Sequence, residues 1–184
     1  MVLMGSDYEH MKHGEIAPNF TIPATDGKIY SLKDFKGAKA LLIVFMCNHC
    51  PYVIPKIAEL KRITMDYKDK GLVVVGINPN EDKNYPEDSF ENMQKLVEEE
   101  DINFVYLRDE SQEIAKTYGA VCTPDPFLFD SDFKLVFHGR IDDTHGSSPA
   151  NDHELYRAIG EFLENKEIKV EEKESMGCSI KWKY

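Results

Sequence analysis

The sequence is short of positive charge, which limits its expected partners. Its 22 Lys and Arg residues are outnumbered by 33 Asp and Glu residues, so the formal net charge is −11. Proteins that bind nucleic acid are usually basic, because contacts to phosphates dominate their affinity. Nucleic acid and anionic membrane surfaces are therefore excluded as the main expected partners.

Long apolar stretches and dense cysteines are missing too. The longest apolar run, residues 40–46, is far shorter than the roughly 18 residues that a membrane-spanning helix needs. Residues 1–14 lack the positive segment followed by an apolar one that marks a secretory signal. We therefore expect no membrane span and a cytoplasmic location. The 4 cysteines are too few for a small disulfide scaffold, so their placement matters more than their number.

The chain does contain enough apolar material for one ordered domain. Hydrophobic residues make up 42% and aromatic residues 11%, which excludes bulk disorder. We expect a flexible N-terminal tail over residues 1–14, one domain over 15–165, and a polar C-terminal tail over 166–184 that contains Cys178.

Strand and helix signals alternate along this domain. A β-hairpin is expected around Asp26-Gly27, a dipeptide typical of tight turns. The other expected strands, several of them continuously apolar, are 40–46, 72–77, 104–107, 127–129 and 133–137. Helices are expected from Pro51 to Gly71, from Pro86, before Gly119 and near the C-terminal end of the domain. This order predicts an α/β fold with a mixed central sheet, helices on both faces and an N-terminal β-hairpin extension.

Cys47-Asn48-His49-Cys50 is a C-x-x-C motif at the end of the buried strand 40–46. The carboxyl ends of strands form the active crevice in open α/β sheets, and C-x-x-C in this context is typical of redox chemistry. Residues three apart share a helical face, which brings the two sulfurs within bonding distance. If a helix begins at Pro51, its N-terminus favours the thiolate of Cys47, and a His49 imidazolium adds to that effect.

Two other interpretations of the motif are weaker. Half of a zinc site would need two more ligands, and Cys122 and Cys178 are single, while nothing fixes the geometry of His138 or His145 as donors. An inert structural disulfide is disfavoured in a cytoplasmic chain. Redox chemistry is therefore preferred, with no resident metal.

Several segments together resemble a known family. They are Ala17-Pro-Asn-Phe20, Asp26-Gly27, Leu32-Lys-Asp-Phe35, the strand 40–46 that leads into Cys47-Asn-His-Cys50-Pro51, and Thr123-Pro124. With them, residues 15–165 resemble the thioredoxin-like superfamily, and within it the alkyl hydroperoxide reductase and thiol-specific antioxidant branch. The ending 175–183 is similar to that of a bacterial and archaeal subgroup of thioredoxin-like proteins.

The resemblance implies a thioredoxin-like fold and assigns roles. Cys47 would be the attacking thiol and Cys50 the resolving thiol, with Asn48 and His49 in support. Thr123-Pro124 would be the cis-proline site beside the cysteines, where the backbone of Thr123 pairs with an extended substrate chain. His49 matches a position shared with disulfide isomerases, which implies a more oxidising pair than that of thioredoxin.

The sequence also departs from these relatives. Met46 stands where thioredoxins carry Trp, and Leu41 replaces their buried acid, so the group that exchanges protons with Cys50 is unnamed. Peroxiredoxins place Thr three residues before the reactive cysteine, where this chain has Val44. Arg108 and Arg140 are the only candidates for their active-site arginine, although such residues are more often surface groups in ion pairs.

Cys122 and Cys178 leave alternatives open. Cys122 is two residues before Pro124, and a buried hydrophobic role is slightly favoured over a redox role. Cys178 could be a further redox thiol that reaches Cys122 or the C-x-x-C pair, the fourth ligand of a metal site with Cys47, Cys50 and Cys122, or an ordinary exposed thiol. Asp125 could influence the cysteines or serve a turn.

The favoured function is a thiol–disulfide oxidoreductase that acts through Cys47 and Cys50 in cell redox homeostasis. It needs no organic cofactor, takes a disulfide-containing protein or a small thiol compound as substrate, and requires a thiol reductase that recycles it. The alternatives are a thiol peroxidase with antioxidant activity and a cysteine-based metal-binding or redox-sensing module.

Overall fold

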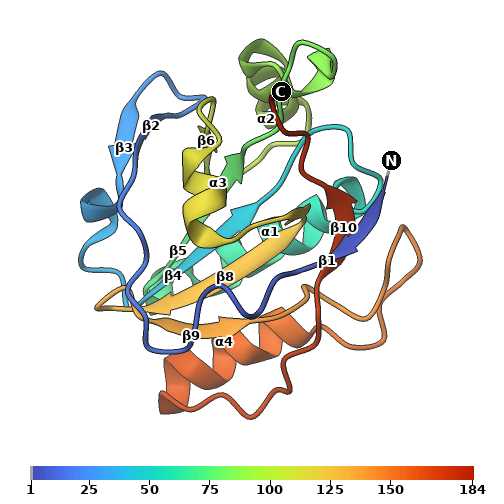
Figure 1. The fold of residues 1–184 in the computed structure, drawn as a ribbon. Coiled ribbons are helices and arrows are strands. Elements are labelled where there is room, and N and C mark those ends of the chain that lie inside the picture. Colours follow the sequence, from blue (N-terminus) through green and yellow to red (C-terminus); the bar gives the residue numbers. More distant parts are fainter. Residues whose placement is uncertain (1) are drawn as a thin grey trace.

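A computed structural model describes residues 2–184, and a mixed sheet forms its centre (Figure 1). The strand order is β6-β5-β4-β8-β9. The bounds are β4 Ala40–Phe45, β5 Leu72–Asn78, β6 Val105–Arg108, β8 Asp125–Asp130 and β9 Leu135–His138. β4, β5 and β6 run parallel, whereas β8 is antiparallel to β4 and to β9. The expected mixed sheet is confirmed.

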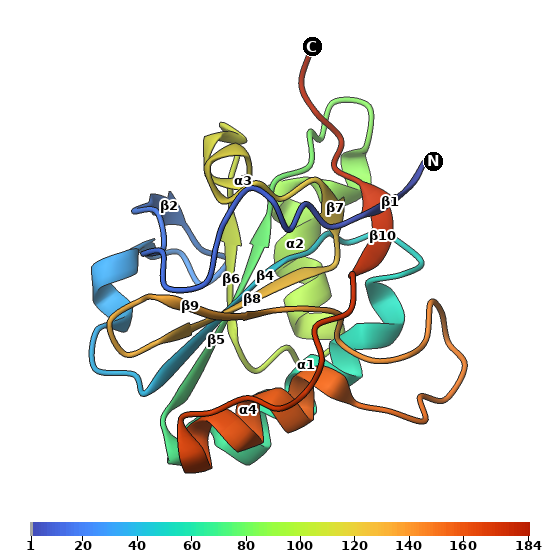
Figure 2. The same cartoon turned by 60° about the horizontal axis from the view of Figure 1, so that its bottom comes forward.

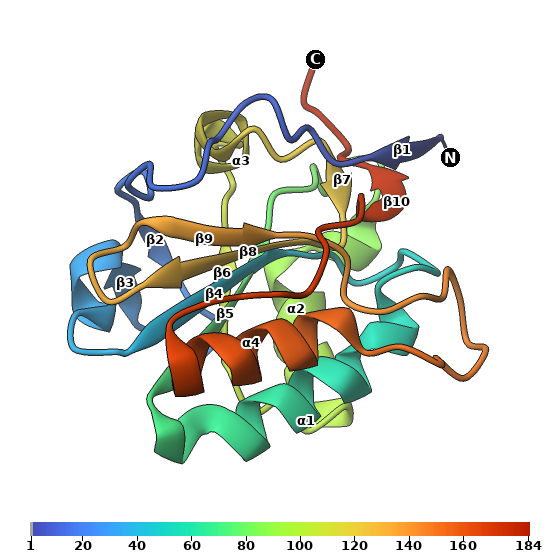
Figure 3. The same ribbon diagram turned by 90° about the horizontal axis from the view of Figure 1, so that it is seen from below.

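Helices cover both faces of this sheet, and β4 is buried between them. The helices are α1 Ile57–Tyr67, α2 Phe90–Glu99, α3 Glu113–Tyr118 and α4 Glu154–Asn165. Leu42 and Val44 join the core beneath α1, α2 and α4, whereas Leu41 and Ile43 join the core beneath α3. Figure 3 shows α1 and α4 on one side of the sheet and α3 on the other. A continuously apolar strand is what this two-sided burial requires.

The expected N-terminal hairpin is present. It consists of β2 Thr21–Pro23 and β3 Ile29–Ser31, which pair antiparallel. Gly27 supplies the positive φ of 82° that its turn needs. The hairpin and a short 3₁₀ helix, Leu32–Phe35, pack on the α3 side of the sheet.

The N-terminal tail was expected to be flexible and the C-terminal tail to be polar and irregular, with a short strand or a docked segment around Trp182, and the structure differs. β1 (Leu3–Gly5), β10 (Met176–Ser179) and β7 (Cys122–Thr123) form a second sheet in the order β1-β10-β7. Figure 2 shows β1 and β10 side by side. Pairing between the first and last few residues of a chain leaves no local periodic signal, which is why the predicted tails 1–14 and 166–184 missed it. Residue 1 lies outside the described residues.

The first helix begins later than predicted. The segment after Cys50 forms a turn and then a 3₁₀ helix, Ile54–Lys56, before α1 starts at Ile57. Val53 and Ile54 both donate their backbone N–H to the carbonyl oxygen of Cys50, at 2.9 and 3.1 Å. Pro51 and Pro55 have no N–H to donate, so this segment cannot continue the regular α-helical ladder. Cys47 is therefore not at the N-terminus of an α-helix.

Within residues 2–184, no helix is both long enough and apolar enough to cross a bilayer.

Candidate functional site

Cys47 and Cys50 lie in the loop after β4, and both side chains are fully buried. Thr123 and Pro124 lie beside them because the β4–β8 ladder pairs Phe45 with Asp125, the residue after Pro124. Cys47 Sγ is 3.2 Å from Oγ1 of Thr123. Cys50 Sγ lies 3.4 Å from the carbonyl oxygen of Thr123. The Thr123-Pro124 bond is cis. One residue of the cis-proline loop thus contacts both sulfurs.

Asn48 fixes the loop between the cysteines. Its backbone N–H donates to Oδ1 of Asp88 at 2.6 Å, and its side-chain amide donates to the carbonyl oxygen of Glu87 at 2.8 Å. Its Oδ1 accepts a hydrogen bond of 2.9 Å from the hydroxyl of Tyr106. These contacts hold the C-x-x-C loop against β6 and against the segment before α2.

Asp88 is a site residue that the sequence did not reveal. Its carboxylate is fully buried, and its Oδ2 lies 2.6 Å from Nδ1 of His49. The side-chain amides of Asn78 and Asn80 also donate to it, at 3.2 and 2.8 Å. Burial acts to raise the pKa of Asp88, but His49 and the amide donors outweigh it, and the net pKa is lowered. The pKa of His49 is raised, first because of its contact with Asp88.

The expected charge distribution on the two thiols is reversed. Burial, a hydrogen bond with Cys50 and the charge of Asp88 all raise the pKa of Cys47. Hydrogen bonds from Cys47 and Cys178 lower the pKa of Cys50 to about 5, although burial opposes them. The helix N-terminus that was expected to stabilise the Cys47 thiolate is absent, and His49 is engaged by Asp88. The two pKa shifts therefore favour the thiolate form of Cys50 over that of Cys47.

The reduced protein is therefore expected to hold a thiolate at neutral pH. The pKa of Cys50 is about 5. As the pH is lowered, the ultraviolet absorbance of the thiolate should therefore fall with a midpoint near pH 5. Cys50→Ser should abolish this transition. Cys122→Ser is the matched control, because burial raises the pKa of that thiol and keeps it protonated. A wild-type midpoint near the ordinary thiol value of about 8.5 would contradict this assignment.

Cys178 joins the cluster, whereas Cys122 faces other groups. β10 pairs with β7 so that Cys178 is opposite Thr123, and its Sγ lies 2.8 Å from Sγ of Cys50. The sulfur of Cys122 instead lies 3.9 Å from the hydroxyl of Ser6 and 4.0 Å from the carbonyl oxygen of Ser175. Of the alternatives left open by the sequence, the structure places Cys178, not Cys122, in contact with the C-x-x-C pair.

The metal-ligating groups combine differently from the four-cysteine set considered above. Among the described residues, one group of three such side chains has donor atoms within 4.8 Å of one another: Cys47, His49 and Asp88. His138 does not reach the cysteines, since its Nε2 is 2.7 Å from Oδ1 of the buried Asp125. Asp125 thus has a buried partner of its own. His145 is exposed.

The two arginine candidates are engaged elsewhere. Arg140 binds the buried carboxylate of Glu154 through Nε and Nη2, at 2.8–3.0 Å. Arg108 is buried, donates to the carbonyl oxygen of Asn80 and lies 3.4 Å from Asp82. Val44 is buried in β4 and offers no hydroxyl. A hydroxyl does reach Cys47, but it comes from Thr123.

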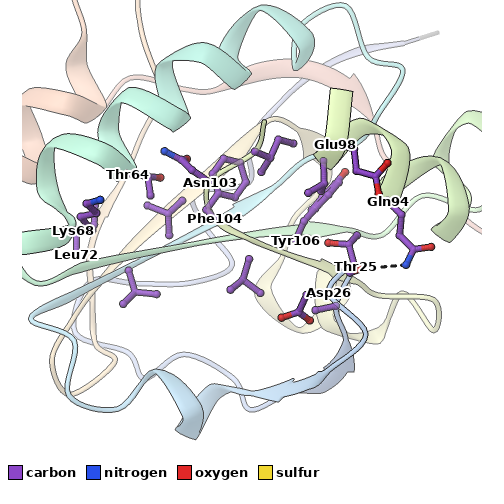
Figure 4. Close-up of a pocket in the computed structure, with 16 residues that line it drawn as sticks. Thr25, Asp26, Thr64, Lys68, Leu72, Gln94, Glu98, Asn103, Phe104 and Tyr106 are labelled. Atoms are coloured by element: carbon purple, nitrogen blue, oxygen red, sulfur yellow. Dashed lines mark hydrogen bonds between the residues drawn. The ribbon is translucent and has the colours of Figure 1, made fainter. Parts of the chain in front are cut away.

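A pocket with a volume of about 630 Å³ lies away from the sulfurs. Figure 4 shows its lining residues between α1, α2 and the β2–β3 hairpin. Its lining includes Thr64, Glu98 and Phe104 but none of the cysteines. Tyr106 also lines it and connects it to the site through Asn48. This pocket and the buried cysteine cluster are therefore separate parts of the structure.

Comparisons with known proteins agree with this geometry. The AhpC/TSA family matches residues 13–138. A crystal structure of an uncharacterized conserved protein from Geobacillus kaustophilus is 42% identical, covers 100% of this chain and 97% of its own, and has a TM-score of 0.93. The thiol-disulfide oxidoreductase ResA of Bacillus cereus is 30% identical over 131 residues, which are 71% of each chain. Peroxiredoxin Bcp of Escherichia coli is 28% identical over 109 residues, which are 59% of this chain and 65% of that protein.

The matched segment spans the sheet from the hairpin to β9 and contains both cysteines of the motif. The thioredoxin domain of a thiol-disulfide oxidoreductase from Bacteroides vulgatus shares the arrangement of its elements, with a TM-score of 0.66 and 23% identity over 83% of this chain and 99% of that one. The chain therefore belongs to the AhpC/TSA family of thiol-dependent oxidoreductases and has a thioredoxin-like fold.

Proposed function

We propose that this oxidoreductase exchanges disulfides through Cys47 and Cys50. The observation that supports it best is that Thr123, next to the cis proline, contacts both sulfurs, at 3.2 and 3.4 Å. Cys47 attacks a substrate disulfide and forms a mixed disulfide. Cys50 then attacks Cys47 and releases the reduced substrate. The cysteine sulfurs carry both electrons, so the exchange needs no organic cofactor.

A shared proton reconciles this order with the low pKa of Cys50. The two thiols are hydrogen-bonded to each other, so their titration belongs to the pair rather than to either residue. Transfer of the proton from Cys47 to Cys50 leaves Cys47 as the thiolate, with the hydroxyl of Thr123 as its hydrogen-bond donor. The nearby, partly exposed His49 and the buried Asp88 form a pair that can exchange the proton that leaves the two sulfurs.

Substrate and location are part of the proposal. The substrate is a protein or small-molecule disulfide, a separate thiol reductase recycles the enzyme, and the compartment is the cytoplasm. The Bacillus cereus relative is a thiol-disulfide oxidoreductase, which supports a disulfide substrate for this chain. Fractionation of cells that produce the chain would test the compartment.

Trapping identifies the attacking thiol. Cys50→Ser removes the resolving sulfur, so a covalent adduct between Cys47 and a substrate such as insulin should accumulate and be visible by mass. Cys47→Ser should form no adduct and should lose insulin reduction driven by dithiothreitol. Cys122→Ser is the control and should behave like the wild type. An adduct in Cys47→Ser but not in Cys50→Ser would reverse the two roles.

A peroxidase is the second candidate function, and one contact favours it. The Thr123 hydroxyl lies on Cys47 Sγ and supplies the hydroxyl that Val44 cannot provide, and one relative is a peroxiredoxin. The ion pair between Arg140 and Glu154 argues against the peroxidase, because Arg140 is then not available to bind the peroxide. The rate at which the Cys47 thiol is lost distinguishes the two candidate functions. Oxidation of Cys47 that is faster with hydrogen peroxide than with insulin would favour the peroxidase.

A further inference from the structure

The chain's own C-terminal strand, β10, pairs with β7 next to the cis Thr123-Pro124 bond. In the register of β10 with β7, Cys178 is opposite Thr123 and Ser179 is opposite Cys122. An added Cβ on Gly177 would lie 2.0 Å from the carbonyl oxygen of Thr123, so only glycine permits this close approach. β10 therefore runs against the backbone of the cis-proline loop as an extended segment that carries a cysteine.

Contacts on both sides of Cys178 hold this position. Before it, the hydroxyl of Ser175 donates to the carbonyl oxygen of Pro124 at 2.6 Å. After it, the backbone N–H of Lys181 donates to Oδ1 of Asn80 at 2.9 Å. Cys178 itself is 1% exposed. The strand is thus anchored to two separate parts of the site, and the sulfur between the anchors is placed by the fold.

The sulfur that Cys178 meets is the resolving one. Its Sγ lies 2.8 Å from that of Cys50, which is less than 1 Å longer than the S–S bond of about 2.05 Å. Burial and the neighbouring Cys50 raise the pKa of Cys178 to about 12 in the reduced protein. Oxidation of Cys50 to a disulfide removes the part of this shift that Cys50 causes, while the part caused by burial remains.

We propose that Cys178 is a third redox-active residue, which replaces Cys47 as the partner of Cys50 in the disulfide. The thiolate of Cys178 attacks Sγ of Cys50, the Cys50–Cys178 bond forms, and the Cys47–Cys50 bond breaks. Cys47 leaves as a thiolate and takes up the proton that Cys178 lost. One disulfide is exchanged for another, so no outside oxidant is needed. The inference rests on the proposed function, which supplies the first disulfide.

The consequence is that the reactive thiol and the stored disulfide lie on different cysteines. Cys47 returns to the thiol state while the oxidising equivalent is stored on Cys50 and Cys178. The new bond also ties β10 covalently to the C-x-x-C loop and keeps the docking edge of β7 covered. A reductant has to break this bond before a substrate chain can pair with Thr123.

Disulfide mapping of the full chain tests the proposal. The protein is equilibrated in glutathione buffers and its thiols are then blocked in acid. After digestion with trypsin, the masses of the peptides are measured. Cys47 and Cys50 share peptide 40–56, Cys178 lies in peptide 174–181, and Cys122 lies in peptide 117–134. The oxidised wild type should yield peptide 40–56 linked to 174–181. Cys178→Ser should reduce this signal to background, and Cys122→Ser should leave it unchanged.

A second variant removes any dependence on the first disulfide. In Cys47→Ser, mild oxidation should join Cys50 to Cys178 directly, because Cys178 Sγ lies 2.8 Å from Cys50 Sγ, whereas the remaining thiol, Cys122, contacts Ser6 and Ser175. Absence of the linked peptide in both the wild type and Cys47→Ser would overturn the proposal.

Insulin reduction separates this failure from that of the proposed function. Full turnover with a disulfide confined to peptide 40–56 would leave the proposed function intact and overturn the role of Cys178. A linked peptide in a protein without turnover would mark a static crosslink and overturn both.

Discussion

Replacing Gly177 with alanine is expected to lift β10 from β7 and to expose the buried thiols to alkylation. The added Cβ would lie 2.0 Å from the carbonyl oxygen of Thr123 and 2.6 Å from its carbonyl carbon. Both are backbone atoms, which cannot swing aside as the end of a long side chain can. Either β10 retreats or the cis-proline loop shifts, at a cost of about 1–3 kcal/mol that is typical of overpacking.

The measurement is the rate of alkylation of the native, reduced protein, followed by mass. If the thiols react through local opening of β10, a loss of 1–3 kcal/mol raises this rate by roughly 5- to 150-fold. Gly146→Ala is the matched control, because an added Cβ there meets no atom within 4 Å. Equal rates in Gly177→Ala and the wild type would show that the thiols do not react through opening of β10.

Faster alkylation would also explain how a buried pair serves an external substrate. Cys47 and Cys50 are fully buried in the closed arrangement, so a substrate disulfide has to displace part of the cover. β10 holds Cys178 against Cys50, and its removal bares the backbone of Thr123 as well. Displacement of β10 would therefore expose the cysteine sulfurs and the backbone edge of β7 at the same time. This makes β10 the element that controls access to the site.

The central sheet could be predicted because its signal is local. Residues 40–46 are continuously apolar, and a strand buried on both faces has that pattern. The position of Thr123-Pro124 beside the cysteines came from the family resemblance, and the pairing of Phe45 with Asp125 accounts for it. The start of the first helix was predicted wrongly, since a proline can open a helix and can also prevent one, and here Pro51 and Pro55 delay α1 to Ile57.

The rest of the site depends on contacts between distant segments. β10 follows a charged stretch and is only four residues long, so its sequence resembles an irregular tail. Its partners are β1 and β7, which no local pattern connects to it. Asp88 lies just after Pro86, which indicated only the beginning of a helix. Its role becomes visible when the fold places the ends of β4 and β5 beside it.

Removal of the charge on Asp88 is expected to destabilise the protein strongly. The carboxylate accepts hydrogen bonds from the backbone of Asn48 and from the amides of Asn78 and Asn80, and it contacts His49. In Asp88→Asn one oxygen becomes an NH₂ group that faces another donor, so buried donors lose their acceptor. We expect a loss of about 3 kcal/mol in the free energy of unfolding. Glu87→Gln is the control, because it removes a charge from the exposed neighbour.

The pH dependence of this loss identifies its cause. The pKa of Asp88 is lowered from 3.8, so its contribution is complete above that pH and is lost as the pH falls through the folded-state pKa. The pKa of His49 is raised from 6.5, so its contribution is complete below that pH and is lost as the pH rises through the folded-state pKa. The difference in stability between the wild type and Asp88→Asn should therefore be largest between pH 3.8 and 6.5.

Urea unfolding across this range measures the difference, and thiol titration adds a second readout. The charge of Asp88 helps to raise the pKa of Cys47, so Asp88→Asn should lower that pKa. Asn80 joins the two effects, because it donates to Asp88 and also accepts the backbone N–H of Lys181 at the end of β10. A variant as stable as the wild type at pH 5, with an unshifted Cys47, would show that the buried carboxylate supports neither the fold nor the thiols. A destabilised variant in which Cys50 is alkylated faster would show that Asp88, through Asn80, helps to keep β10 in place over the site.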